Sequence, residues 1–243
     1  MEINKSVILI TGGATRFGKV MTSRLIQEGA TVIVHYNTNK EGSDSIVMQH
    51  GNAQAIQADL TNTNDIQRLL DTIFATHNKL DAIINNASMF EAIDIEDLTI
   101  PQWEYQQTLH NTAPFLLSKA LYQYKKNYGG QMFSGCIINI IDSSIDHPSK
   151  KRVAYGCAKS ALLGQTRILA ASMAPWVRVN AISPGFFLSS SASDDAYKEK
   201  LLQRLPLQKL AEEEDILDAI LLLLNNESIT GIHIAVDCGE HLL

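Results

Sequence analysis

A tyrosine and a lysine stand four residues apart, at positions 155 and 159, within a stretch whose apolar spacing is helical. Two helical residues four apart share one face, so both side chains project to the same side. A tyrosine with an ordinary pKa near 10 donates a proton at neutral pH only if its anion is stabilised by a neighbouring cation. The spacing therefore indicates a proton donor, Tyr155, with an ammonium group beside it.

A glycine-rich turn, TGGATRFG at residues 11–18, lies between an apolar run and a helical stretch. Its glycines permit a tight turn and let a pyrophosphate approach the backbone, while the helix N-terminus offers free N–H groups. An ordinary glycine-rich turn would look similar from spacing alone. The flanking strand and helix favour a nucleotide site.

The second apolar run ends in His35, Tyr36, Asn37 and Thr38, and no Asp or Glu follows before position 41. Folds that prefer NAD place an acidic residue there for the ribose 2′-hydroxyl. Arg16 and Lys40 are cations that could instead reach a 2′-phosphate, although Lys40 could equally be a solvated surface charge. This segment favours NADP.

Composition excludes several classes of protein. The 243 residues are 45% hydrophobic and 19% charged, which is typical of a globular chain and not of a disordered one. The net charge of −6 provides no basic field for nucleic acid or an anionic membrane. No apolar run approaches the ~20 residues that span a bilayer, so we expect a cytoplasmic protein. The cysteines form no CxxC and the histidines show no ligand spacing, so we expect no metal.

The elements that must position these residues alternate along the chain. Strands are predicted at residues 6–11, 31–35, 53–58, 80–85, 136–141, 177–183 and 232–236. Helices are predicted at residues 17–28, 40–50, 63–76, 101–128, 153–174 and 212–225. Continuous apolar strands in such a succession are typical of a doubly wound parallel α/β sheet in a single domain, 1–243. Residues 184–211 break the rhythm, and a loop this long is usually functional.

The sequence resembles the short-chain dehydrogenase/reductase family over essentially its whole length. The resemblance is carried by residues 11–18, Asp59 in QADL, NNA at 85–87, Asn111 in HNTAPFLL, YGCAK at 155–159, RVNAISPG at 178–185 and the C-terminal ITGIHIAVDCG. It implies a Rossmann-type sheet of about seven strands and hydride transfer with a nicotinamide cofactor. It also implies that Tyr155 donates the proton, that Lys159 binds the ribose and lowers the tyrosine pKa, and that Asn111 holds a water in the proton relay.

One departure narrows the resemblance. Most members carry a serine about a dozen residues before the tyrosine, whereas this chain has Asp142 there. A carboxylate would repel a carbonyl oxygen but suits a substrate with N–H donors. The pteridine reductase branch, which includes dihydromonapterin and dihydrobiopterin reductases, has Asp at this position. The chain also resembles that branch in Arg16 and in NNASMF at 85–90, which places Phe90 against a pterin ring.

The resemblance thus implies a set of site residues. The cofactor NADP(H) would contact Gly12, Arg16, Phe17, Gly18, Tyr36, Asn37, Thr38, Asp59, Leu60, Asn86, Ala87, Ser88, Tyr155, Lys159, Pro184 and Gly185. The substrate would contact Arg16, Ser88, Phe90, Asp142 and Tyr155, and the catalytic residues would be Asp142, Tyr155, Lys159 and Asn111. Asn37 and Thr38 stand where the branch often has an arginine, which weakens the NADP preference.

The leading hypothesis is an NADPH-dependent reductase of pterins: dihydromonapterin, dihydrobiopterin or dihydrofolate. Two alternatives stay open: a carbonyl or 3-oxoacyl reductase with its serine replaced by Asp142, and an idle NADP-binding regulator. Individual residues also have structural alternatives, because Asp142 could cap a turn, Phe90 could be plain packing and Asn111 could kink its helix. The family typically builds homotetramers through its long helices, although Phe115 and Leu162 could face this chain's own sheet.

Overall fold

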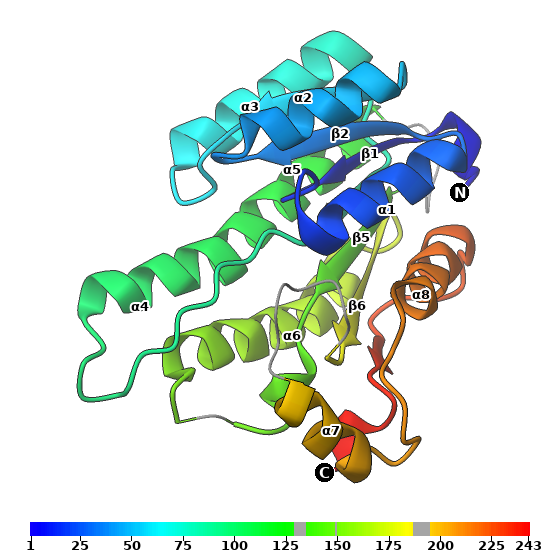
Figure 1. Cartoon of the computed structure of the whole chain (residues 1–243). Helices are drawn as coiled ribbons and strands as arrows, with labels where there is room; N and C mark the ends of the chain where they lie inside the picture. Colours follow the sequence, from blue (N-terminus) through cyan, green and yellow to red (C-terminus); the bar gives the residue numbers. More distant parts are fainter. Residues whose placement is uncertain (129–134, 149, 187–194) are drawn as a thin grey trace.

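The computed structural model describes residues 1–128, 135–148, 150–186 and 195–243 of the chain (Figure 1). Its centre is a sheet of seven parallel strands in the order β3-β2-β1-β4-β5-β6-β7. The strands are β1 (Val7–Ile10), β2 (Thr31–Tyr36), β3 (Ala53–Gln57), β4 (Ala82–Asn85), β5 (Gly135–Ile140), β6 (Val177–Pro184) and β7 (His233–Val236). The predicted doubly wound α/β sheet is confirmed.

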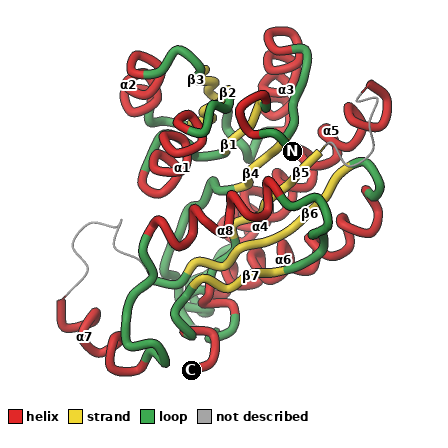
Figure 2. Tube along the Cα trace, turned by 90° about the vertical axis from the view of Figure 1, so that its right-hand side faces the viewer, coloured by secondary structure: helices red, strands yellow, loops and turns green. Residues whose placement is uncertain are grey.

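Helices cover both faces of this sheet (Figure 2). They are α1 (Arg16–Gln27), α2 (Lys40–Gln49), α3 (Thr63–His77), α4 (Ile100–Gln107), α5 (Ala113–Tyr128), α6 (Val153–Met173), α7 (Asp195–Arg204) and α8 (Glu213–Asn225). Side chains alternate between the faces of a strand, so Ile8 packs with α1, α2 and α8, whereas Leu9 packs with α3, α5 and α6. Both faces of the central strands are therefore buried, as their continuous apolar runs require.

Two segments differ from the sequence-based prediction. The helix expected over 101–128 is interrupted by a π-helical turn, Thr108–Thr112, between α4 and α5. Such turns are uncommon, occur often at functional sites and leave no mark in the apolar periodicity. The predicted loop at 184–211 contains the helix α7, and its residues 187–194 lie outside the described part of the chain.

The carboxyl ends of parallel strands meet at one edge of a sheet, which is where open α/β folds bind ligands. The glycine-rich turn follows β1, Asn86 follows β4 and Asp142 follows β5, so all three lie at this edge. In the described residues, none of the helices is both long enough and apolar enough to cross a membrane.

Candidate active site

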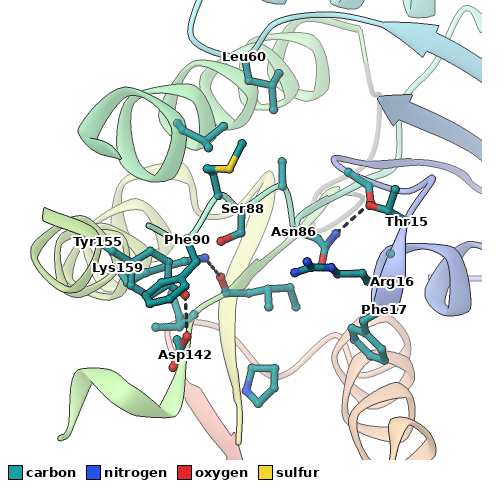
Figure 3. A pocket seen from close by; sticks show the side chains of 18 of the residues that line it. Thr15, Arg16, Phe17, Leu60, Asn86, Ser88, Phe90, Asp142, Tyr155 and Lys159 are labelled. Atoms are coloured by element: carbon teal, nitrogen blue, oxygen red, sulfur yellow. Dashed lines mark hydrogen bonds between the residues drawn. The ribbon is translucent and has the colours of Figure 1, made fainter. Parts of the chain in front are cut away.

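A cavity of about 630 Å³ lies at the carboxyl edge of the sheet (Figure 3). Every predicted site residue except Asn111 lines it. They are Gly12, Arg16, Phe17, Gly18, Tyr36, Asn37, Thr38, Asp59, Leu60, Asn86, Ala87, Ser88, Phe90, Asp142, Tyr155, Lys159, Pro184 and Gly185. The fold thus brings residues predicted from distant segments into one cavity.

The glycine-rich turn is shaped by close backbone approaches. Gly12 has φ of +65°, and a Cβ there would lie 3.1 Å from Cα of Ala87. A Cβ on Gly18 would lie only 2.0 Å from the carbonyl oxygen of Gly12. No side-chain capping bond closes the N-terminus of α1 at Thr15, so this end of the helix fits an anionic phosphate group.

His35 holds the glycine-rich turn in place through hydrogen bonds, a role that was not predicted from the sequence. Its Nδ1 accepts a hydrogen bond from the backbone N–H of Gly12 at 3.1 Å, and its Nε2 lies 3.0 Å from the carbonyl oxygen of Ala58, to which it donates. Burial lowers the pKa of His35 to about 4, so the ring is neutral at physiological pH. In the sequence, the only sign of this role is a histidine within the apolar run of the second predicted strand.

The end of β2 presents no carboxylate to the cavity, since its lining residues are Tyr36, Asn37, Thr38 and Asn39. Of the two predicted cations, Arg16 lines the cavity, whereas Lys40 does not. Lys40 is exposed and forms an ion pair with Asp44 at 2.5 Å. Of these two cations, Arg16 is the one that can meet an anionic ligand in the cavity, and Lys40 is a solvated surface charge.

The Tyr155 hydroxyl donates a hydrogen bond to Oδ2 of Asp142 at 2.6 Å (Figure 3). The other carboxylate oxygen, Oδ1, accepts the backbone N–H of Ser144 at 2.8 Å and caps the 3₁₀ turn Ser143–Ile145. One oxygen of Asp142 therefore caps the turn, as the structural alternative expects, while the other contacts Tyr155. The cap fixes the carboxylate so that Oδ2 faces the tyrosine.

The electrostatics of Tyr155 differ from the sequence-based expectation that Lys159 lowers its pKa. Burial raises the pKa of Tyr155 well above 10, and the charge and hydrogen bond of Asp142 raise it further. Lys159 is itself buried, and its Nζ donates to the carbonyl oxygen of Ile140 at 2.7 Å. Burial lowers the pKa of Lys159 to about 8, against the opposing effect of Asp142. The charge that acts most strongly on Tyr155 is thus the carboxylate.

Phe90 lies at the mouth of the cavity and is 45% exposed, so it is not plain core packing. Its ring meets that of Tyr155 edge-on at 5.5 Å. The guanidinium of Arg152 lies over the Phe90 ring at 4.2 Å from its centroid. Arg152 was missed because it lies at the N-cap of α6, where local sequence gives no sign of a ring partner.

Asn111 was predicted to be catalytic, but the structure does not bring it into the cavity lining. Its Oδ1 accepts a hydrogen bond from Nε2 of Gln165 at 2.8 Å, and its carbonyl oxygen lies 3.3 Å from the same nitrogen. The π-helical turn places Asn111 against α6 and sets the preceding residue, His110, against Tyr155, with ring centroids 5.2 Å apart. Sequence reasoning gave no role to His110.

A second carboxylate, Glu240, lines the cavity from the C-terminal segment. Its Oε2 accepts hydrogen bonds from the backbone N–H of Phe186 at 3.0 Å and from Oγ of Ser143 at 3.2 Å. These bonds join the segments that follow β5, β6 and β7. Glu240 and Ser143 are 97 positions apart in the sequence, so no local pattern could predict their contact.

Known proteins similar to this chain were found by sequence and by structure. The family described as enoyl-(acyl carrier protein) reductase matches residues 13–241. A dihydromonapterin reductase of Shigella flexneri is 31% identical over 235 residues, covering 97% of this chain and 96% of the relative. The dihydromonapterin reductase of Escherichia coli K12 is 30% identical over the same share of each chain.

Solved structures agree with the sequence comparison. FolM alternative dihydrofolate reductase 1 from Brucella canis, crystallised with NADP, superimposes with a TM-score of 0.90 at 30% identity, covering 100% of this chain and 97% of that one. A short-chain dehydrogenase from Bacillus anthracis superimposes with a TM-score of 0.88 at 28% identity, covering 99% and 98%. With the glycine-rich turn, Tyr155 and Lys159 lining one cavity, these matches show that the chain belongs to the short-chain dehydrogenase/reductase family of oxidoreductases.

Proposed function

We propose that this chain is an NADPH-dependent reductase of pterins, with dihydromonapterin, dihydrobiopterin and dihydrofolate as candidate substrates. The observation that carries the proposal is the hydrogen bond from Tyr155 to Asp142 at 2.6 Å inside the cavity. A carboxylate beside the proton donor disfavours a carbonyl oxygen on which negative charge develops. It favours a ring that offers N–H donors. The similar dihydromonapterin reductases and the FolM structure point to the same substrate class.

The residues around the glycine-rich turn fit a dinucleotide cofactor. Gly12, Gly18 and the N-terminus of α1 would hold its pyrophosphate, and Asp59 and Leu60, which the resemblance implies as cofactor contacts, line the same cavity. NADP is favoured because the end of β2 presents no carboxylate, because Arg16 lines the cavity, and because the FolM relative carries NADP. When bound, the cofactor supplies the hydride.

The proton would come from the pair formed by Tyr155 and Asp142. The tyrosine hydroxyl already donates to the carboxylate, so a substrate nitrogen that takes the tyrosine proton would leave an anion next to Asp142. Two cations would offset this charge: Arg152, whose charge lowers the pKa of Tyr155, and Lys159, with its ammonium 5.8 Å from the centroid of the Tyr155 ring.

The substrate would lie against Phe90, with Ser88, Arg16 and Asp142 at its polar edge. One face of the Phe90 ring is covered by Arg152, which would hold the ring in place while the other face meets the ligand. Pro184, Gly185 and Phe186, at the start of the predicted substrate loop 184–211, line the same cavity.

The proposal is tested by following NADPH oxidation at 340 nm with the three dihydropterins and, in parallel, with a panel of ketones and 3-oxoacyl thioesters. Turnover of at least one dihydropterin, lost in Tyr155→Phe, is the expected result. Activity on a ketone with none on any pterin would overturn it in favour of a carbonyl reductase. Asp142→Ser separates the two further, since it should lower pterin reduction, whereas a carbonyl reductase should gain ketone activity.

We propose further that the protein assembles as a homotetramer through α5 and α6. Phe115 and Ile168 on these helices are 39% and 65% exposed, whereas Leu162 is buried in this chain's own core. Exposed apolar side chains on long helices favour burial against a second copy. Sedimentation velocity at micromolar concentration should give the mass of four chains, and Ile168→Glu should lower it.

A further inference from the structure

His110 is buried in the π-helical turn, directly behind the loop that carries Ser88 and Phe90. Its side chain has only 1% of its surface exposed, and it makes three polar contacts. Nδ1 lies 3.1 Å from the carbonyl oxygen of Gln106. Nε2 lies 3.3 Å from the backbone N–H of Met89 and 3.0 Å from Oγ of Ser88.

The two backbone contacts fix the tautomer of the ring. A carbonyl oxygen can only accept, so Nδ1 must carry a hydrogen and donate it to Gln106. The backbone N–H of Met89 can only donate, so Nε2 must present its lone pair. The ring is therefore neutral with hydrogen on Nδ1, in agreement with the pKa of His110, which burial lowers to about 3.

The fixed tautomer decides the direction of the bond to Ser88. Because Nε2 has no hydrogen, the 3.0 Å contact is a hydrogen bond in which the Ser88 hydroxyl donates, and it competes with the bond that this hydroxyl can donate to Tyr155. A hydroxyl has one hydrogen, so the oxygen of Ser88 has only lone pairs left for the cavity that it lines. Ser88 can then accept a hydrogen bond from a ligand but cannot donate one.

We propose that His110 is a positioning residue that makes Ser88 an obligate acceptor and so selects substrates that bring an N–H or O–H donor to this side of the cavity. Asp142, also an acceptor, lines the same cavity. The inference rests on the oxidoreductase family and on Ser88 lining the site, and not on the substrate being a pterin.

Two amide variants of His110 form a matched pair. In His110→Gln the amide oxygen can reach the place of Nε2 and accept from Ser88, whereas in His110→Asn the shorter amide can replace Nδ1 but does not reach Ser88. Kinetics should be measured for both, for Ser88→Ala and for the double variant Ser88→Ala/His110→Asn. The substrate is a compound of the pterin and ketone panels that carries an N–H or O–H donor and that the wild-type enzyme reduces, so failure of the pterin proposal leaves this test intact, whereas reduction of donor-free ketones alone would overturn the inference.

His110→Asn is expected to lower kcat/KM by about 10-fold, mainly through KM, and His110→Gln by less than about 3-fold, with the NADPH Kd unchanged in both. If His110 acts through Ser88, the double variant should be no worse than Ser88→Ala within about 2-fold. Three results would overturn the proposal. The double variant could lose kcat/KM by the product of the two single losses, His110→Asn and His110→Gln could lose kcat/KM equally, or the loss in kcat/KM could be matched by a weaker NADPH Kd. Should His110→Asn fold poorly by its melting temperature, a His110→Gln enzyme as impaired as Ser88→Ala would also overturn it.

Discussion

Tyr155 and Asp142 share a hydrogen bond of 2.6 Å in which the phenol donates and Oδ2 accepts. The other oxygen of Asp142 is held by the backbone N–H of Ser144 at 2.8 Å, so the carboxylate cannot rotate away without breaking the cap of the following turn. Tyr155, the proposed proton donor, is therefore tied to an anion that a local turn keeps in place.

Replacing Asp142 by Asn should lower the pKa of Tyr155, because the negative charge and the ionic acceptor that raise it are both removed while burial remains. The basic limb of the pH–rate profile, where it reports tyrosine ionisation, should then move to lower pH. Loss of the carboxylate from the proton supply should reduce kcat/KM for a pterin by about 100-fold. Asp146→Asn, an exposed carboxylate nearby that does not line the cavity, is the control and should behave as wild type. An unchanged pterin rate in Asp142→Asn would contradict the assignment.

Lys159 should give the free enzyme a pH limb near 8. Burial lowers its pKa to about 8, so the ammonium is present below that pH and is lost above it. Since the ammonium offsets the charge left on Tyr155, kcat/KM for NADPH should fall as the pH rises through about 8. Lys159→Met should lose most of the activity and also this limb. A wild-type profile that stays flat from pH 7 to 9.5 would be incompatible with the role given to Lys159.

Arg16 and Lys40 should differ in their effect on the cofactor. Arg16 lines the cavity, whereas Lys40 is 71% exposed and paired with Asp44. Arg16→Ala should weaken NADPH binding by about 10- to 100-fold, as expected for a charged hydrogen bond to phosphate. Lys40→Ala serves as the matched control, and its NADPH Kd from fluorescence titration should equal that of the wild type. Equal losses in both variants would show that only the general charge of the region matters.

Arg152 should support substrate binding through Phe90. Its guanidinium lies 4.2 Å from the centroid of the ring, and removal of a cation–π partner is expected to raise KM by about 5-fold. The NADPH Kd should not change. Lys150→Ala removes a nearby exposed cation that does not line the cavity, and it should leave KM unaltered. The role of Arg152 would be refuted if Arg152→Ala kept the wild-type KM for the reduced substrate.

His35 should make the protein sensitive to acid. Its pKa is about 4 in the folded state, below the ordinary value of 6.5, so between these pH values the unfolded chain binds a proton that the folded protein does not. The free energy of unfolding should therefore decrease as the pH falls from 6.5 to 4, with His35 contributing about 3 kcal/mol to the change. Urea unfolding at several pH values should show that the free energy of unfolding of His35→Gln depends less on pH than that of the wild type. The same dependence in both proteins would exclude His35 as its source.

The sequence by itself determined the succession of elements, the glycine-rich turn and the shared face of Tyr155 and Lys159. These features depend on short-range periodicity, backbone sterics and helical spacing, which are properties of neighbouring residues. The position of Asp142 relative to Tyr155 could also be predicted from the sequence, because Asp142 follows one predicted strand and Tyr155 lies in the next predicted helix. The other residues expected around the turn came from the resemblance to the short-chain dehydrogenase/reductase family, and they line the cavity.

Only the tertiary structure decided which groups surround these residues. The contact of His35 with Gly12 joins residues 23 positions apart, and that of Glu240 with Ser143 joins residues 97 apart, so neither is encoded in a local pattern. The π-helical turn likewise directs Asn111 to Gln165 and His110 toward Tyr155, and local spacing predicts neither contact. Hydrogen-bond directions and pKa values depend on such long-range neighbours and on burial, and both are products of packing.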